Sequence, residues 1–186
     1  FLGSALAGAF SGAIAAAQRF AIDSVREFAV YEQGLLQLKL AGETNLSALS
    51  QRIQDTAKAT RIFSATEVSV TVGELVKAGY DAETAFKLVE IGALGASTEV
   101  DAMTGKFGDL TATSTQLGSI LRALGLDTSQ AGRVMDVMAK AAQDSNLNVS
   151  DLVDIVSRVG PTAKLAGLEI EDLAAMAGVL ANNGME

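Results

Sequence analysis

The residues of this chain that could do chemistry are carboxylates, and they gather at the starts of predicted helices. Asp151 and Asp154 are three residues apart on one helix face, and Glu169, Glu171 and Asp172 form a second group. Paired carboxylates can act as general acid and general base. Acidic residues are also favoured in the first turn of a helix, where the helix dipole is positive. Because the second explanation covers both groups, we interpret these residues as structural.

The sequence lacks the residues that other kinds of catalysis require. The 186 residues include no Cys and no His, which excludes thiolate nucleophiles, histidine acid–base catalysis and most zinc sites. Ser64 and Ser150 have no histidine to activate them. Gly105-Lys106 lacks the strand and the glycine pattern of a phosphate-binding loop. We therefore expect no enzyme activity and predict no catalytic, cofactor-binding or metal-binding residue.

The charge pattern argues against a nucleic-acid partner. The net charge is −8, and the 14 Lys and Arg residues are scattered singly along the chain. A surface that binds phosphates needs clustered basic side chains. We therefore expect no sequence-specific binding of nucleic acid.

The elements that would position any site are predicted to be helices. The chain is 49% hydrophobic with a single proline, and its apolar residues, methionines included, recur at helical spacing. Four triplets of glycine, an apolar residue and an acid follow these stretches: Gly79-Tyr80-Asp81, Gly125-Leu126-Asp127, Gly167-Leu168-Glu169 and Gly184-Met185-Glu186. Glycine ends one helix and the acid begins the next. The pattern predicts short helices joined by glycine corners, whose uneven spacing does not indicate a repeat.

Three further signals refine this all-α prediction. Ser64 and Glu67 form a capping box, and Asn148 caps a later helix. Pro161 either begins a new turn or kinks a helix that runs through it. We expect residues 97–115 to form a loop with one helical turn near residues 100–106.

The N-terminal region is predicted to form one long helix that ends at Gly42. Residues 1–17 carry no charge, and an apolar stripe continues to Leu38. The uncharged run is interpreted as a helix buried against partner helices, or alternatively as a membrane-inserting segment. The predicted helix-packing face consists of Ser4, Gly8, Gly12, Ala16, Val25, Phe28, Tyr31, Leu35 and Leu38.

This organisation predicts two domains and an oligomer. Residues 1–42 would form the long helix, and residues 43–186 a multi-helix domain. A long helix with one apolar stripe needs a partner, either the following domain or other copies of the chain in a coiled coil. The first residue is Phe and the last triplet resembles another helix start, so we expect a fragment of a longer polypeptide.

Taken together, the motifs resemble the core region of phage tail tape measure proteins, over roughly residues 57–184. The segments that carry the resemblance are Glu27-Phe28, Thr60–Glu67, Glu74–Tyr80, Gln130–Ala142, Val149–Leu152, Val159–Ala163, Ala166-Gly167 and Ala177–Gly184. Each segment by itself contains only common helix-start and helix-end residues. The order of the segments along the chain is what makes the resemblance specific. Residues 97–115 depart from the family by being longer, and the family has no catalytic motif.

The resemblance implies a structural role in phage tail assembly. A tape measure protein is a long, largely helical chain that sets tail length, because a helix has a fixed rise per residue. The implied partners are other copies of the chain, tail tube and tail tip proteins, assembly chaperones and the host membrane at ejection. The implied location is the tail lumen or tail tip of the virion (a siphovirus tail), after assembly in the host cytoplasm and before release ahead of the DNA.

Two other functions remain open from the residues alone. The uncharged strip that begins at Ser4 would suit a membrane-active or pore-forming helical domain. The amphipathic helices would suit an adaptor module that binds partners in apolar grooves.

Overall fold

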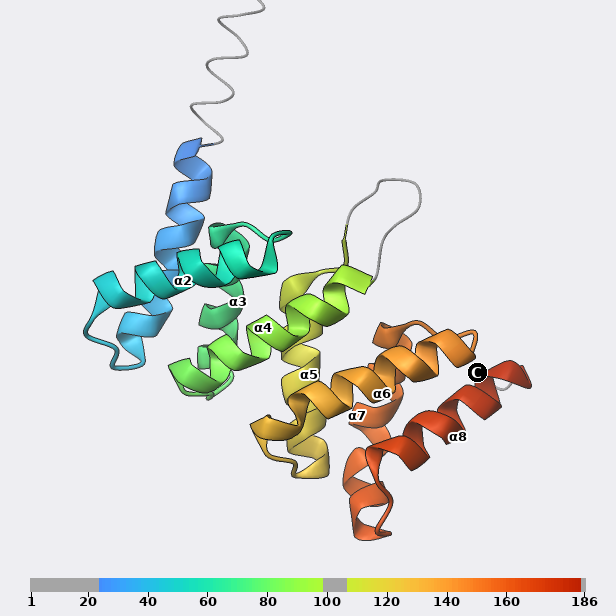
Figure 1. Cartoon of the computed structure of the whole chain (residues 1–186). Helices are drawn as coiled ribbons and strands as arrows, with labels where there is room; N and C mark the ends of the chain where they lie inside the picture. The colour runs from blue at the N-terminus through green and yellow to red at the C-terminus, as the bar shows by residue number, and fades with distance from the viewer. Residues whose placement is uncertain (1–23, 99–106, 185–186) are drawn as a thin grey trace, which may run out of the picture.

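The computed structural model describes residues 24–98 and 107–184, which form an all-α fold with no β-strand (Figure 1). This confirms the predicted fold class. The described chain is helical over residues 24–40. The helices that follow are α2 (Leu46–Thr60), α3 (Ala65–Lys77), α4 (Ala82–Thr98), α5 (Leu110–Leu124), the short 3-10 helix η1 (Thr128–Gln130), α6 (Ala131–Asp144), α7 (Val149–Leu165) and α8 (Ile170–Asn182).

The helices alternate between two layers, although the sequence did not indicate a repeat. Helices α2, α4, α6 and α8 lie side by side in one layer, and α3, α5 and α7 form the second layer across them (Figure 1). Among the described α-helices, those in extensive contact are separated by no more than one other α-helix along the chain. The result is an open, linear array. Residues 24–40 and α2 lie at one end of it, and α7 and α8 lie at the other.

Several connections between helices use glycine in the left-handed backbone conformation, which other residues adopt only at a cost. Positive φ angles occur in the described chain at Gly42, Gly79, Gly125, Gly167 and Gly184, with values from +61° to +100°, and at Arg61. After Gly79, the Tyr80 N–H donates to the Leu75 carbonyl at 3.1 Å. The Leu126 N–H makes the same bond to Leu121 at 2.8 Å. These bonds satisfy carbonyl groups that the helix end would leave unpaired.

Side chains of the predicted residues cap the helix starts. The Ser64 N–H donates to Glu67 Oε2 at 2.8 Å, and the Glu67 N–H donates to Ser64 Oγ at 3.2 Å. Asn148 and Asp151 form the same reciprocal pair at the start of α7. Each pair satisfies two backbone donors that have no partner within the helix. Asp151 therefore has a capping role.

The structure decides between the two interpretations of Pro161. Helix α7 runs from Val149 to Leu165 and contains Pro161 within it. The adjacent Gly160 faces α5, where a Cβ added to it would lie 3.2 Å from the Ala123 Cβ. Packing of α7 against α5 at Gly160 therefore supports the helix beside Pro161, the residue that weakens it locally.

The prediction of a loop over residues 97–115 was wrong at both ends. Helix α4 continues to Thr98, and α5 already begins at Leu110. Asp109 starts α5 by accepting a hydrogen bond from the Ala112 N–H at 2.9 Å. The threonines of this segment have low helix propensity, but Thr113 is buried and so gains from packing. The helical turn that was predicted near residues 100–106 lies outside the described residues.

The core runs along the array between the layers. Its fully buried large side chains come from successive helices, among them Ile53, Leu75, Phe86, Leu117, Met138 and Leu152. Met135 and Met138 fill the core as their spacing predicted, whereas Met176 on α8 is 44% exposed. Leu180, on the same helix, is also exposed. The last helix therefore buries only part of its apolar surface.

Candidate interaction surfaces

The predicted helix-packing face is only partly described by the structure. Ser4, Gly8, Gly12 and Ala16 lie outside the described residues. Of the other five residues, Leu38 is fully buried, Tyr31 and Leu35 are half-buried, and Val25 and Phe28 are exposed. The stripe therefore packs against the array only toward its C-terminal end.

The helix of residues 24–40 packs against the array through small residues. A Cβ added to Gly34 would lie 2.5 Å from the Ser69 carbonyl oxygen of α3 and would also meet Ser69 Oγ. Ser69 Oγ donates a hydrogen bond to the Tyr31 carbonyl at 2.8 Å. The Tyr31 hydroxyl is 2.8 Å from Ser50 Oγ of α2. These contacts join residues 24–40 to α2 and α3, and the division of the chain at residue 42 stays a prediction.

The same helix has a second apolar side. The sequence analysis assigned Val25 and Phe28 of this side to the packing face, and it did not identify Leu36 and Leu40. Val25, Phe28, Leu36 and Leu40 are exposed, and at 100° per residue they lie within about 120° of one another. We call these four residues the N-terminal row. It faces away from Gly34, which contacts α3. The row therefore points out of the array at its N-terminal end.

Glycines set the distance between helices elsewhere in the array. A Cβ added to Gly92 of α4 would lie 3.0 Å from Ser114 Cα of α5. At Gly118, the same atom would lie 2.8 Å from the Tyr80 hydroxyl, which donates to the Gly118 carbonyl. Sequence analysis did not single out Gly92 or Gly118. Glycines inside helical stretches, at a cost in helix propensity, were the signal that could have revealed these contacts.

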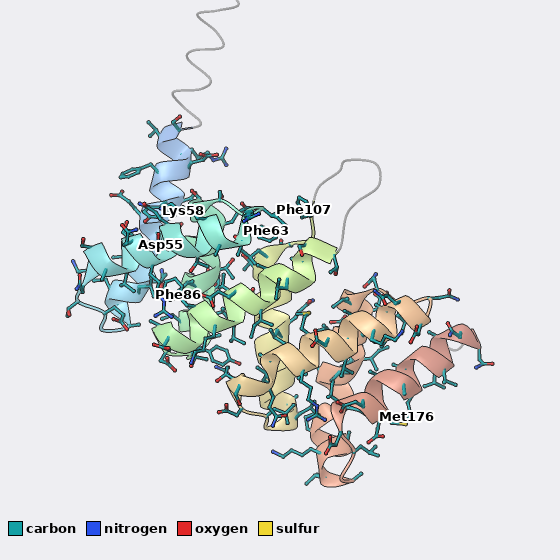
Figure 2. The ribbon with its side chains drawn as sticks, viewed as in Figure 1. Asp55, Lys58, Phe63, Phe86, Phe107 and Met176 are labelled. Atoms are coloured by element: carbon teal, nitrogen blue, oxygen red, sulfur yellow. The ribbon has the colours of Figure 1, made fainter. Side chains whose placement is uncertain are left out.

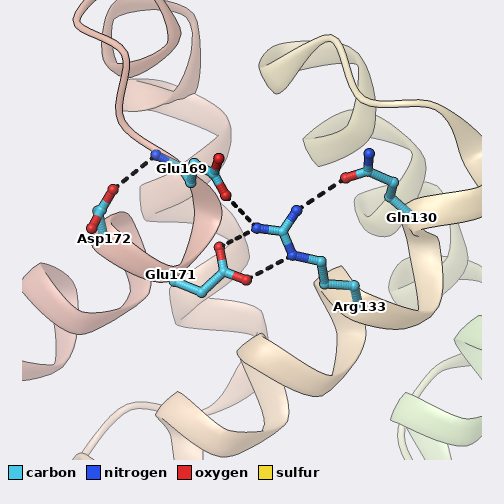
Figure 3. A network of polar contacts seen from close by, with 5 residues as sticks. All are labelled: Gln130, Arg133, Glu169, Glu171 and Asp172. Carbon is cyan, nitrogen blue, oxygen red and sulfur yellow. Dashed lines mark hydrogen bonds and ion pairs between the residues drawn. The ribbon is translucent and has the colours of Figure 1, made fainter.

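Two arginines join neighbouring parts of the array. Arg122 stacks its guanidinium 3.9 Å from the Tyr80 ring centroid and donates to the Ala78 carbonyl at 2.6 Å. Arg133, at the start of α6, contacts the corner between α7 and α8 (Figure 3). Its Nε and Nη2 donate to the two carboxylate oxygens of Glu171, each at 2.7 Å. Its Nη2 also contacts Glu169.

The electrostatics of these carboxylates match a structural role. Hydrogen bonds from Arg133 lower the pKa of Glu171. Hydrogen bonds from Thr84 lower the pKa of Asp81. Both shifts favour the charged form, because the partners donate to it. A catalytic acid would need the opposite shift. Within residues 24–98 and 107–184, no group of three or more carboxylates is arranged to hold a metal ion.

An open groove of about 560 Å³ runs between α6 and α8. It is lined by the small residues Ala141, Ala174 and Gly178, and by the ion pair between Lys140 and Asp144, whose charged atoms are 3.1 Å apart. Small side chains on both helices leave the groove open. The groove is wide enough to accept side chains of a partner.

A row of apolar side chains lies on α8 beside this groove. Met176, Val179 and Leu180 are exposed, and their spacing of three and four residues places them along one side of the helix. We call them the C-terminal row. Figure 2 shows Met176 on the side of α8 that faces away from α6. Met176 therefore points out of the array at its C-terminal end, whereas Val179 also lines the groove between α6 and α8.

Residues 1–17, the candidate membrane-inserting segment, lie outside the described residues. Among the helices that the structure describes, none combines the length and the apolar character needed to cross a bilayer.

The fold and its surfaces define a class: an all-helical array with packing surfaces and structural carboxylates. Residues 50–186 match the model of the family described as phage-related minor tail protein. The chain belongs to this family, and it is therefore a structural component of a phage tail and of the virion. The resemblance to tape measure proteins is confirmed by a relative, the tape measure protein of Pneumococcus phage Dp-1.

The match covers only part of the relative, which limits the properties of the relative that can be assigned to this chain. The two sequences are 38% identical over 125 residues, which is 67% of this chain and 10% of the relative. The chain thus matches about a tenth of the relative's length. No solved structure matches this chain.

Proposed function

We propose that the chain is a segment of a tape measure protein that sets tail length. The observation that carries the proposal is the 38% identity to the tape measure protein of phage Dp-1. The array supports it, because each α-helix packs on the α-helices one or two places away along the chain. In such an array, the length of the structure grows with the number of residues.

The proposed location is the tail lumen or the tail tip, with the protein leaving ahead of the DNA at ejection. The net charge of −8 supports this location, because a surface of that sign repels DNA rather than retaining it. The proposed partners are other copies of the chain, tail tube and tail tip proteins, assembly chaperones in the host cytoplasm, and the host membrane at ejection.

The test is an in-frame deletion of residues 110–144, which form α5, η1 and α6, from the parent phage gene. Tail length is then measured by electron microscopy of purified virions. We expect shorter tails, by up to about 1.5 Å for each residue removed if the segment lies in the tail as extended helix.

A matched control replaces the same residues with an unrelated helical sequence of equal length. This control should restore the original tail length, because the proposal is that the number of residues, and not their sequence, sets the length of the tail. Tails of unchanged length in the deletion variant would contradict the proposal.

A further inference from the structure

Helix α8 is packed only on helices that come before it in the chain. The described helices in extensive contact with α8 are α6 and α7. Helix α4, which lies inside the array, contacts α2 and α3 before it and also α5 and α6 after it. Within the described residues, α8 therefore lacks the cover that α4 receives from later helices.

Helices α4 and α8 begin in the same way, which allows their positions to be compared. Each begins directly after the acid of a glycine corner, Asp81 for α4 and Glu169 for α8. At equal distances from these acids, three positions are buried in both helices: Ala85 and Leu173, Phe86 and Ala174, and Val89 and Ala177. The two helices thus turn corresponding sides toward the array.

Two other corresponding positions are buried on α4 and exposed on α8. Leu88 of α4 is fully buried, whereas its counterpart Met176 is 44% exposed. Gly92 of α4 is buried against Ser114 of α5, whereas its counterpart Leu180 is 47% exposed. Met176 and Leu180 lie about one helical turn apart on one side of α8. On α4, the helix that covers Gly92 is the next helix along the chain.

We propose that Met176 and Leu180 form the docking surface for a helix of the same polypeptide that follows residue 186. This helix lies on α8 as α5 lies on α4, and it continues the array. The inference rests on the proposed function in taking the chain as a segment of a longer protein. The length of the relative supports it, because the matched part is only 10% of the tape measure protein of phage Dp-1.

The local pattern of contacts identifies the occupant. Extensive contacts between the described α-helices join helices that are one or two places apart along the chain. Residues 1–23 precede the helix at the opposite end of the array (Figure 1), and residues 185–186 are too few for a helical turn. A following helix of the same polypeptide keeps the pattern, whereas residues 1–23 or a second copy would break it.

The surface also determines what kind of helix it accepts. The last element of a linear array needs a polar outer face, and Met176 and Leu180 do not provide one. The docked helix therefore presents apolar side chains to α8. Because Leu180 stands where α4 has Gly92, this helix should lie farther from α8 than α5 lies from α4.

The experiment measures how fast a thiol at the docking surface reacts. The chain has no cysteine, so Met176→Cys reports on one position. The variant is made in residues 1–186 and in a longer chain that is extended through the next two predicted helices of the parent phage gene. Reaction with a soluble aromatic disulfide should be slower by about tenfold or more in the longer chain, because a covered thiol is protected.

A matched control and a second variant support the measurement. Leu94→Cys changes an exposed residue of α4 and should react equally fast in the two chains. Leu180→Asp should leave the urea midpoint of residues 1–186 unchanged and lower that of the longer chain, because only there does the charge become buried without a partner. Circular dichroism checks that each variant keeps its helical content.

Three results would overturn the inference. Met176→Cys could react equally fast in the two chains. It could react slowly in residues 1–186 and faster after deletion of residues 1–23, which would assign the surface to that segment. It could react slowly in residues 1–186 and faster on dilution, which would indicate a second copy. None of these results changes the tail length expected in the deletion experiment, so failure of this inference is distinguishable from failure of the proposed function.

Discussion

Gly34 and Ser69 bring two helices together at a point where no larger residue than glycine fits. A Cβ added to Gly34 would lie 2.5 Å from the Ser69 carbonyl oxygen, which belongs to the backbone of α3 and cannot rotate away. The Ser69 hydroxyl holds the same contact by donating to the Tyr31 carbonyl at 2.8 Å. Distances between helices in this array are therefore set by individual glycines.

The first prediction compares two glycine substitutions that should change the free energy of unfolding in opposite directions. Gly34→Ala should lower the free energy of unfolding by about 1–3 kcal/mol, because the helices must separate to make room. Gly132→Ala, in α6 where nothing lies within 4 Å, should raise it by about 0.5–1 kcal/mol, since alanine favours the helix. Urea unfolding measures both values, and effects of the same sign would contradict this account.

The second prediction compares two buried serines. Ser114 Oγ has no hydrogen-bond partner among the described residues, so Ser114→Ala should leave stability unchanged or raise it. Ser69→Ala removes the bond to Tyr31 and should cost about 1 kcal/mol. Thermal and urea unfolding of the two variants check this difference. A loss at Ser114 equal to that at Ser69 would mean that the Ser114 hydroxyl does form a hydrogen bond.

The third prediction concerns acid pH. Hydrogen bonds hold the pKa of Asp81 below its ordinary 3.8 and the pKa of Glu171 below its ordinary 4.5. A pKa lowered by folding contributes stability above the unfolded-state value, and this contribution is lost as the pH falls through the folded-state value. The melting temperature should therefore fall as the pH drops below about 4.5.

A variant separates the capping acid from the other groups. Asp81→Asn keeps a side chain that can cap α4 but cannot titrate. Its melting temperature should fall less steeply between about pH 5 and pH 3 than that of the unmodified chain. Parallel curves for the two proteins would show that Asp81 does not contribute.

The fourth prediction concerns the contact of Arg133 with the corner between α7 and α8. Arg133→Gln should lower stability only slightly, because the side chains are exposed and screened by water. The loss should nearly vanish in about 1 M salt. As a control, Lys140→Gln removes a single ion pair within α6 and should cost about 0.2–0.5 kcal/mol. Urea midpoints at low and high salt measure both losses, and a loss that persists in high salt would contradict an electrostatic origin.

The sequence by itself determined the helices and many of their ends. The capping boxes at Ser64 and Asn148 were predictable because both partners lie within three residues of one another. The direction of each chain reversal was not predictable, and so the two-layer array was missed. The interpretation of the carboxylates as structural also depended on local position alone.

Only the tertiary structure decided how far α4 and α5 extend, how α7 continues through Pro161, and which side of each helix is covered. These outcomes depend on contacts between residues distant in the sequence, such as Thr71 with Thr111 at 2.7 Å. The helix of residues 24–40 is another example. It has two apolar sides, and the spacing of its apolar residues did not show which side contacts α3. Packing selected the side that carries Gly34, because only there can two backbones approach this closely.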